Sequence, residues 1–292
     1  MKLKIGAVSV TPVLGQPEKN LAMMKEWLEK LSGADLVVFP ELFLSGYSIK
    51  DRARAVASEI DRKNILDIIA DMAEEHGACI IFGSPEVEGE NVYNTSILVA
   101  PNGKIGKYRK AHLPNFGPFE EDIHFFKGRE FPIFETRFGK LAMSICYDVF
   151  FPELYRLYAL KGATIMTCIS ASPHISRKYF ETLLPARAIE NTAFVIYSNL
   201  VGIYNSMMFW GGSRIIGPRG DLLGVSREFK EDATVVEIDT REIGVARDFR
   251  TTVDDTRPEL WEELKNLGGG ENGDGDDMRE EDSSEEPVTE GR

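Results

Sequence analysis

Three side chains capable of acid–base or nucleophilic chemistry each follow a segment that we predict to be a buried strand. Glu41 comes after the apolar run 35–39, Lys110 after the segment 104–108, and Cys146 after the apolar run 140–145. An unpaired charge at such a place is costly, so Glu41 either turns to solvent or meets a polar partner. Together, a thiolate could attack a carbonyl or nitrile carbon, a carboxylate could shuttle the proton, and an ammonium group could stabilise the oxyanion.

The sequence around Cys146 predicts a junction between a strand and a helix. Pro152 stands near the first turn of an amphipathic run, where its missing N–H group costs nothing. A thiol at this junction would feel the partial positive charge of the helix N-terminus, so we expect the thiolate to be favoured. The same pattern also fits a small buried residue that closes a strand, which is the ordinary setting of a free cysteine.

The elements that must position these residues alternate between strands and helices. This alternation, with interspersed hairpins, predicts an α/β fold with a mixed sheet flanked by helices. Wholly apolar strands such as 35–39 are typical of a sheet covered on both faces. We predict strands at 4–11, 35–39, 79–83, 94–100, 104–108, 133–138, 140–145, 163–169, 193–200, 213–217 and 233–239, and helices at 17–31, 60–76, 153–161 and 177–191.

Composition and charge exclude several classes of protein. The net charge is −13, of which residues 268–292 carry −8, so the remaining −5 makes the body an unsuitable nucleic-acid binder. No stretch approaches the length of a membrane span. Three cysteines argue against a disulfide framework and for a cytoplasmic location, and the histidines show no metal-ligand spacing. We predict one domain over 1–267 and a disordered acidic tail over 268–292.

The order and contexts of the three residues resemble the nitrilase superfamily of carbon–nitrogen hydrolases. The resemblance covers residues 3 to about 250 and implies a four-layer αββα sandwich that forms a homodimer or a higher homo-oligomer. It assigns catalytic roles to Glu41, Lys110 and Cys146. The matching motifs are Phe39-Pro40-Glu41-Leu42 with Gly46-Tyr47, Tyr108-Arg109-Lys110 with His112-Leu113-Pro114, and Cys146-Tyr147-Asp148 with Phe151-Pro152-Glu153.

Several segments are similar to the glutaminase domain of glutamine-dependent NAD synthetases, including residues 113–121 and Ser170-Ala171-Ser172-Pro173. That similarity implies that Glu121 is a second active-site glutamate, with its neighbour Glu120 as the rival. We expect His112 to make a structural hydrogen bond beside Lys110 and Asp148 to cap the turn after Cys146. The candidate substrate-binding residues are Tyr47, Phe116, Tyr147, Phe150, Ser172 and Lys178.

Departures from the family pattern bear on the substrate. Tyr147 stands where the synthetase branch often has an acidic residue, and Val149 and Phe150 stand where carbamoylases and ω-amidases place an arginine. These residues favour a neutral or apolar amide over an amino acid. Strict nitrilases typically have Cys-Trp-Glu where this chain has Cys146-Tyr147-Asp148, which favours an amide over a nitrile. The resulting prediction is a cysteine amidase without a cofactor or metal, acting on a small linear amide. Alternatives are a glutaminase-like or ω-amidase activity, with Lys178 as carboxylate anchor, a nitrilase, an acyltransferase, or a catalytically silent interaction subunit.

Overall fold

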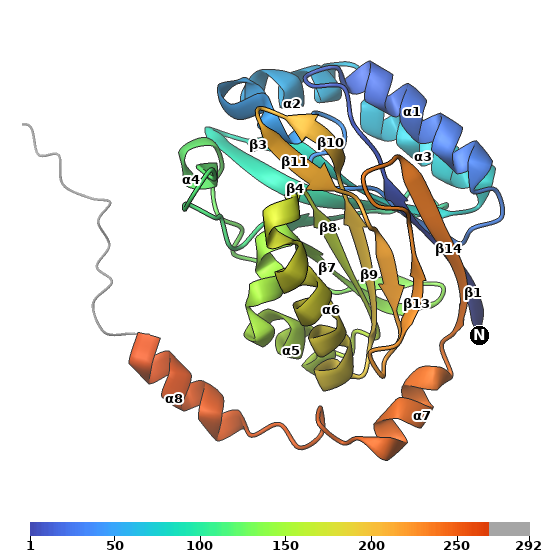
Figure 1. Ribbon diagram of the computed structural model, residues 1–292, viewed down its shortest axis with the longest axis vertical. Helices are drawn as coiled ribbons and strands as arrows, with labels where there is room; N and C mark the ends of the chain where they lie inside the picture. Colours follow the sequence, from blue (N-terminus) through green and yellow to red (C-terminus); the bar gives the residue numbers. More distant parts are fainter. Residues whose placement is uncertain (269–292) are drawn as a thin grey trace, which may run out of the picture. The chain divides into compact units, whose positions relative to one another are not determined.

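The structure is a computed structural model that describes residues 1–268, and it divides into two units, Met1–Asp254 and Asp255–Arg292. Two six-stranded sheets form the first unit (Figure 1). The first sheet has the order β14 (Asp232–Asp239), β1 (Lys2–Ser9), β2 (Leu36–Val38), β3 (Cys79–Glu88), β4 (Asn91–Val99) and β5 (Ile105–Arg109). The second has the order β13 (Leu222–Val225), β12 (Arg214–Ile216), β9 (Phe194–Asn199), β8 (Ile165–Ser170), β7 (Gly139–Ile145) and β6 (Phe134–Thr136).

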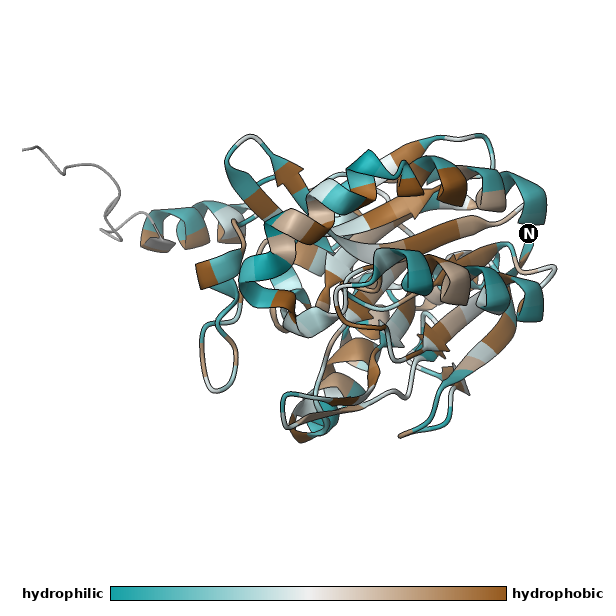
Figure 2. Cartoon of the chain, turned by 90° about the horizontal axis from the view of Figure 1, so that it is seen from above, coloured by the Kyte–Doolittle hydropathy of each residue, from teal (hydrophilic) through white to brown (hydrophobic). Residues whose placement is uncertain are grey.

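Both sheets have apolar residues on their two faces, because both faces are covered. In β1, Leu3 and Ile5 belong to the core between the sheets, whereas Val8 belongs to the core beneath the helices of the first sheet. Successive strand residues point to opposite faces, so one apolar strand supplies two layers. Figure 2 shows hydrophobic residues running along the strands and alternating with hydrophilic ones on the flanking helices.

Helices cover the outer face of each sheet. The helices α1 (Pro17–Lys30), α2 (Ala53–Arg62) and α3 (Ile65–His76) pack on the first sheet, and α5 (Pro152–Leu160) and α6 (Arg177–Asn191) pack on the second. On α5, Leu154, Tyr155 and Tyr158 are buried at the spacing that places them on one side of the helix. The layers therefore follow the order helix, sheet, sheet, helix, which confirms the predicted αββα architecture.

The predicted helix over 60–76 is wrong as a single element. The chain leaves the helical conformation between α2 and α3, where Asn64 adopts a left-handed φ of 49°. Asparagine tolerates this conformation better than most residues, so it separates the two helices. The sequence analysis also missed η1 (Tyr47–Arg52), α4 (Glu121–His124), η2 (Cys146–Phe150), η3 (His174–Ser176), β10 (Val201–Tyr204), β11 (Met207–Trp210), β13, α7 (Glu242–Phe249) and α8 (Pro258–Gly268).

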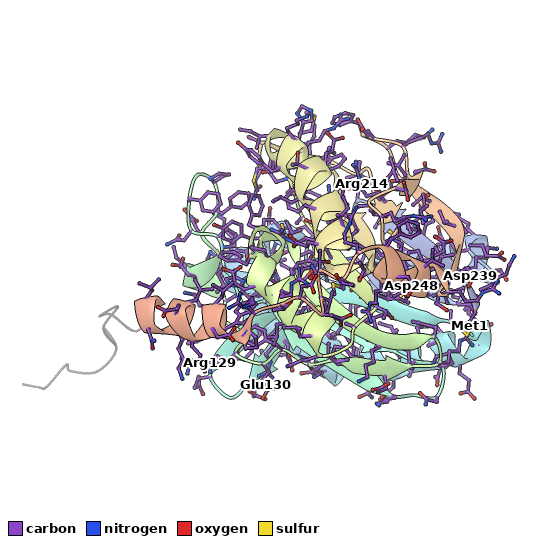
Figure 3. All side chains as sticks on the ribbon, turned by 90° about the horizontal axis from the view of Figure 1, so that it is seen from below. Met1, Arg129, Glu130, Arg214, Asp239 and Asp248 are labelled. Atoms are coloured by element: carbon purple, nitrogen blue, oxygen red, sulfur yellow. The ribbon has the colours of Figure 1, made fainter. Side chains whose placement is uncertain are left out.

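The first and last strands of the first unit lie side by side. The antiparallel pair β1 and β14 runs from Lys2 opposite Asp239 to Ser9 opposite Asp232, and the amino group of Met1 lies 3.3 Å from Asp239 Oδ1 (Figure 3). The second unit contains α8. Of the predicted acidic tail 268–292, only Gly268 is described, as the end of α8, and the rest lies outside the described residues. Within residues 1–268, no helix is long and apolar enough to span a membrane.

Candidate active site

Glu41 lies in a tight turn after β2 that packs directly on β3. Its side chain is 0% exposed and accepts three hydrogen bonds. Lys110 Nζ and Asn94 Nδ2 each donate to Oε1 at 2.7 Å, and the backbone N–H of Ala171 donates to Oε2 at 2.7 Å. These donors come from the regions of β5, β4 and β8, so both sheets hold this carboxylate. The sequence left open whether Glu41 turns to solvent or meets a polar partner, and the structure shows that it meets polar partners.

Lys110 follows β5 and is shared between two carboxylates. Its Nζ donates to Glu41 Oε1 at 2.7 Å and to Glu121 Oε1 at 2.8 Å, and it lies 2.7 Å from Glu121 Oε2 without the geometry of a hydrogen bond to that atom. The hydroxyl of Tyr47 also donates to Glu121 Oε1, at 2.6 Å. Glu120, by contrast, is half-exposed and pairs with Lys50 at 3.3 Å. It is therefore Glu121 and not Glu120 that contacts Lys110.

The charges in this cluster control one another. Burial lowers the pKa of Lys110, but the carboxylates of Glu121 and Glu41 outweigh burial and raise it, so Lys110 is an ammonium ion. Burial raises the pKa of Glu121 to about 7, with Glu41 adding to the rise and Lys110 opposing it. One ammonium group therefore faces two carboxyl groups, and burial brings the pKa of Glu121 close to neutral pH.

Cys146 begins η2, at the end of β7, and is 9% exposed. Its φ of 47° lies in the left-handed region, where the backbone of any residue other than glycine is strained. Burial raises the pKa of the thiol well above its usual value, with Glu41 adding to the rise and Lys110 opposing it. The expectation that the junction favours the thiolate is therefore wrong, because burial and the neighbouring carboxylate of Glu41 raise the pKa of the thiol.

Asp148 fixes the turn that carries Cys146. It is fully buried, and its carboxylate accepts hydrogen bonds from the backbone N–H of Ile145 at 2.9 Å and from the Tyr108 hydroxyl at 2.8 Å. The backbone N–H of His112 at 3.0 Å and its ring Nδ1 at 2.8 Å also bond to Asp148. These contacts confirm that Asp148 caps the turn and that His112 makes a structural hydrogen bond.

The candidate substrate-binding residues lie in four different settings. Aromatic rings gather beside the turn that carries Cys146: Tyr147 lies 5.3 Å, centroid to centroid, from both Phe116 and Phe150. Tyr47 and Glu121 line a cavity of about 150 Å³. Ser172 is fully buried, and its backbone N–H donates to Asn199 Oδ1 at 2.8 Å. Lys178 is exposed on α6, and among the described contacts none joins it to Glu41, Lys110, Glu121 or Cys146.

Sequence reasoning missed residues that hold the cluster together. Asn94 was predicted only as part of a strand. The polar run Asn94-Thr95-Ser96 inside a buried strand was the signal that could have marked it as part of the site. Gly83 permits the Glu41 turn, because a Cβ there would lie 2.1 Å from the backbone nitrogen of Leu42. The turn and strand are further joined by the Gly83 N–H, which donates to the carbonyl of Pro40 at 3.0 Å.

The family model of carbon–nitrogen hydrolases matches residues 4–248. The chain belongs to this family, as the motifs predicted, and it is an enzyme that acts on C–N bonds.

Individual relatives are similar over most of their length. The chain is 34% identical over 243 residues to the nitrilase of Pyrococcus abyssi, covering 81% of this chain and 90% of the relative. It is 34% identical over 264 residues to the 2-oxoglutaramate amidase of Bacillus subtilis, covering 89% and 100%. A solved structure of an amidase from Nesterenkonia sp. AN1 matches with a TM-score of 0.78 at 27% identity, covering 89% and 96%. In that structure the acetamide moiety of fluoroacetamide is covalently added at the active-site cysteine.

Proposed function

We propose that this protein is a cysteine-dependent amidase that hydrolyses a small linear amide through a thioester, releasing ammonia and a carboxylic acid. The observation that carries the proposal is the buried ammonium group of Lys110, bonded to both Glu41 and Glu121 and in electrostatic contact with Cys146. Burying these charges together is expensive, and a purely structural site gains more from apolar packing. The cluster therefore favours a working enzyme over a silent subunit.

In the proposed acylation step, Glu41 takes the proton of the Cys146 thiol as the sulfur forms a bond to the amide carbon. The carbonyl π electrons move to oxygen, and the ammonium group of Lys110 stabilises the oxyanion that forms. When the intermediate collapses, the C–N bond breaks, and Glu41 returns the proton to the nitrogen. Ammonia leaves, and the acyl group stays on sulfur as a thioester.

In the proposed deacylation step, Glu41 takes a proton from water as the water oxygen attacks the thioester carbon. The carbon–sulfur bond then breaks, Cys146 regains a proton from Glu41, and the carboxylic acid is released. Glu121 keeps Lys110 in place through its two close oxygens. Tyr47 in turn orients Glu121 through its hydroxyl hydrogen bond.

The side chains beside Cys146 support a neutral acyl group. The rings of Phe116, Tyr147 and Phe150 bring no charge, so a charged α-amino group would lose its hydration without gaining a partner. The exposed position of Lys178 gives no support to its role as a carboxylate anchor. The similarity to a 2-oxoglutaramate amidase is the specific observation that favours the second candidate, an ω-amidase or glutaminase-like activity. The Pyrococcus relative keeps the nitrilase as a further candidate.

The test is ammonia release from matched aliphatic and aromatic amides, their nitriles, glutamine, 2-oxoglutaramate and N-carbamoyl amino acids at one pH. Neutral primary amides should have the highest kcat/KM, with nitriles slower. A tenfold preference for glutamine or 2-oxoglutaramate, about 1.4 kcal/mol of transition-state preference, would select the second candidate. The rate of acid formation without any added amine tests hydrolysis, because an acyltransferase turns over slowly until an amine acceptor such as hydroxylamine is supplied.

Cys146→Ala should remove hydrolysis while the protein stays folded, and mass spectrometry of the wild type should find the acyl group on Cys146. The matched control is Cys79→Ala, which removes another buried thiol, on β3, and should retain turnover. Turnover above background in the Cys146→Ala variant would rule out the thioester route.

The proposal also covers the cellular location, the assembly and the domain organisation of the protein. We include a cytoplasmic location, a homodimer or larger assembly, and a catalytic domain over 1–267 followed by a separate acidic tail over 268–292. Free cysteines at 79, 146 and 168 support the reducing compartment. Light scattering after chromatography would measure the assembly, and a variant truncated after residue 267 should keep its melting temperature and rate.

A further inference from the structure

Asn94 contacts both polar groups, Glu41 and Lys110, that the first sheet brings close to Cys146. It lies in β4, one residue beyond the last pair that joins β4 to β5. Its backbone carbonyl accepts the N–H of Lys110 at 2.8 Å, and its side-chain Nδ2 donates to Glu41 Oε1 at 2.7 Å. The residue is 0% exposed. A single residue thus fixes the start of the Lys110 side chain and the end of the Glu41 side chain.

The charged neighbours cannot by themselves fix the orientation of Glu41. Lys110 is pulled toward both Glu41 and Glu121, at 2.7 and 2.8 Å. The other titratable groups in electrostatic contact with Glu41 are Tyr47 and Cys146, which donate no described hydrogen bond to it. On Oε2, Ala171 supplies one backbone donor. Among the described residues, Asn94 alone adds a side-chain donor to Oε1 that is not shared with Glu121.

A neutral amide is well suited to this position. A second cation would change the balance of one ammonium group against two carboxyl groups, and another carboxylate would repel Glu41. The Asn94 amide adds a hydrogen bond to a charged acceptor without changing the net charge, and such bonds are worth more than neutral ones. The donor therefore restricts rotation of the carboxylate while Lys110 remains free to interact with Glu121 and with an oxyanion.

We infer that Asn94 is a positioning residue that aims the Glu41 carboxylate at the Cys146 thiol. The inference rests on the proposed function, in which Glu41 removes the thiol proton. It predicts an effect on the chemical step and not on substrate binding, because Asn94 acts through Glu41. It also predicts slower reaction of the thiol with an electrophile other than the substrate.

The experiment measures kcat and KM on the best amide for Asn94→Ala and Asn94→Ser, and in parallel the rate at which iodoacetamide alkylates Cys146, located by peptide mass spectrometry. We expect kcat to fall about 10- to 100-fold with KM changed less than threefold, a range that corresponds to loss of one hydrogen bond to a charged group. Alkylation of Cys146 should slow in the same variants and in Glu41→Gln. The serine variant keeps the site polar with a side chain too short to reach Glu41, so it carries the test if the alanine variant does not fold.

Asn191→Ala is the matched control. Asn191 is also fully buried, its Nδ2 donates to the carbonyl of Arg187 at 3.0 Å, and its Oδ1, like that of Asn94, has no partner among the described residues. Its loss should lower the melting temperature and leave kcat and alkylation within twofold of the wild type. If folded Asn94 variants behave in the same way as this control, Asn94 only packs the interior and the inference is wrong.

The two readouts separate this inference from the proposed function. A wild type that hydrolyses no amide, but whose Cys146 alkylation slows on loss of Asn94, would contradict the amidase and support the positioning role. A wild type that hydrolyses amides, with kcat and Cys146 alkylation unchanged on loss of Asn94, would support the amidase and contradict the positioning role.

Discussion

Arg109 and Lys110 are neighbours in sequence, yet they belong to two ionic clusters of different character. Arg109 pairs near the surface with Glu86 at 3.0 Å and Glu88 at 2.7 Å, and its side chain is 26% exposed. Burial raises the pKa of Glu86, but hydrogen bonds from Arg109 and Lys107 outweigh it and lower the pKa to about 2. Lys110 is 0% exposed and faces Glu41 and Glu121. Burial raises the pKa of the Glu121 carboxyl group to about 7.

The difference is access to water. In the Arg109 cluster, Glu88 is 64% exposed and can be rehydrated, and Glu86, though only 11% exposed, keeps Lys107 as a second partner, so the loss of one pair is tolerated. In the buried cluster, an unpaired charge keeps its full desolvation cost, so every member depends on the others. A basic residue with two glutamates therefore makes a modest stabilising network around Arg109 and a buried, mutually dependent one around Lys110.

Lys110→Met should produce the largest effect, because it leaves Glu41 and Glu121 facing each other without a cation. We expect activity to vanish and the free energy of unfolding to fall by about 3–5 kcal/mol at pH 8. The loss should shrink toward pH 5, since the native state then takes up protons that the unfolded state lacks. Urea unfolding and kcat/KM measure the two quantities.

Arg109→Met is the control for this change, one residue earlier in the chain. It removes the surface pairs and the contact of the guanidinium with the Tyr93 ring, 4.1 Å from its centroid, which together stabilise by about 1–2 kcal/mol. Activity should stay within twofold of the wild type. Equal losses of stability in the two variants would show that burial does not distinguish the clusters.

Gly83→Ala should damage the buried cluster without removing any of its charges. The new methyl group would lie 2.1 Å from the nitrogen of Leu42 and 2.7 Å from Glu41 Cα, so the turn that carries Glu41 must move. We expect kcat to fall about 100-fold or more, since a shift of about 1 Å has effects of this size. Gly244→Ala in α7 meets no atom within 4 Å and should leave kcat unchanged. A normal kcat in Gly83→Ala would mean that the turn is not rigid.

The smallest expected effect concerns Glu121→Gln and the pH dependence of stability. The folded-state pKa of Glu121 lies above that of the unfolded chain, so the native state binds more protons between the two values and loses stability as pH rises. From pH 5 to pH 8 the free energy of unfolding of the wild type should fall by about 1–3 kcal/mol relative to that of Glu121→Gln. Melting temperatures of both proteins across this range give the difference. Glu120→Gln, which changes a half-exposed neighbour, should show no such trend.

The pattern of apolar residues predicted strands and helices in a sheet flanked by helices, because it reflects which faces are covered, whereas the second sheet of the four-layer sandwich was implied only by the resemblance to the family. The helix over 177–191 coincides with α6, and the apolar runs 140–145 and 163–169 coincide with β7 and β8 to within two residues. Short strands such as β10 and β11 were missed, since β10 pairs only with β11 and little apolar patterning marks it. The break at Asn64 was missed because the apolar positions continue across it.

The candidate site could be predicted only in part, for a related reason. Glu41, Lys110 and Cys146 stood out because polar side chains are unusual at the ends of buried strands. The contacts of Asn94 and Ala171 with Glu41 depend on how β4 and β8, from different sheets, are placed around it, which no local pattern contains. The raised pKa of the Cys146 thiol likewise follows from burial in three dimensions and not from its strand-to-helix junction.

The pairing of β1 with β14 has a consequence for how the protein is made. Lys2 and Asp239 are partners across the whole length of the catalytic region, and residues 2–9 can complete their sheet only after residue 239 has been synthesised. Contacts between such distant positions close long loops and slow folding. The first strand must therefore wait, with one edge unpaired, until nearly all of the family region has left the ribosome. Chaperone dependence during synthesis should accordingly be greatest for chains that stop just short of β14.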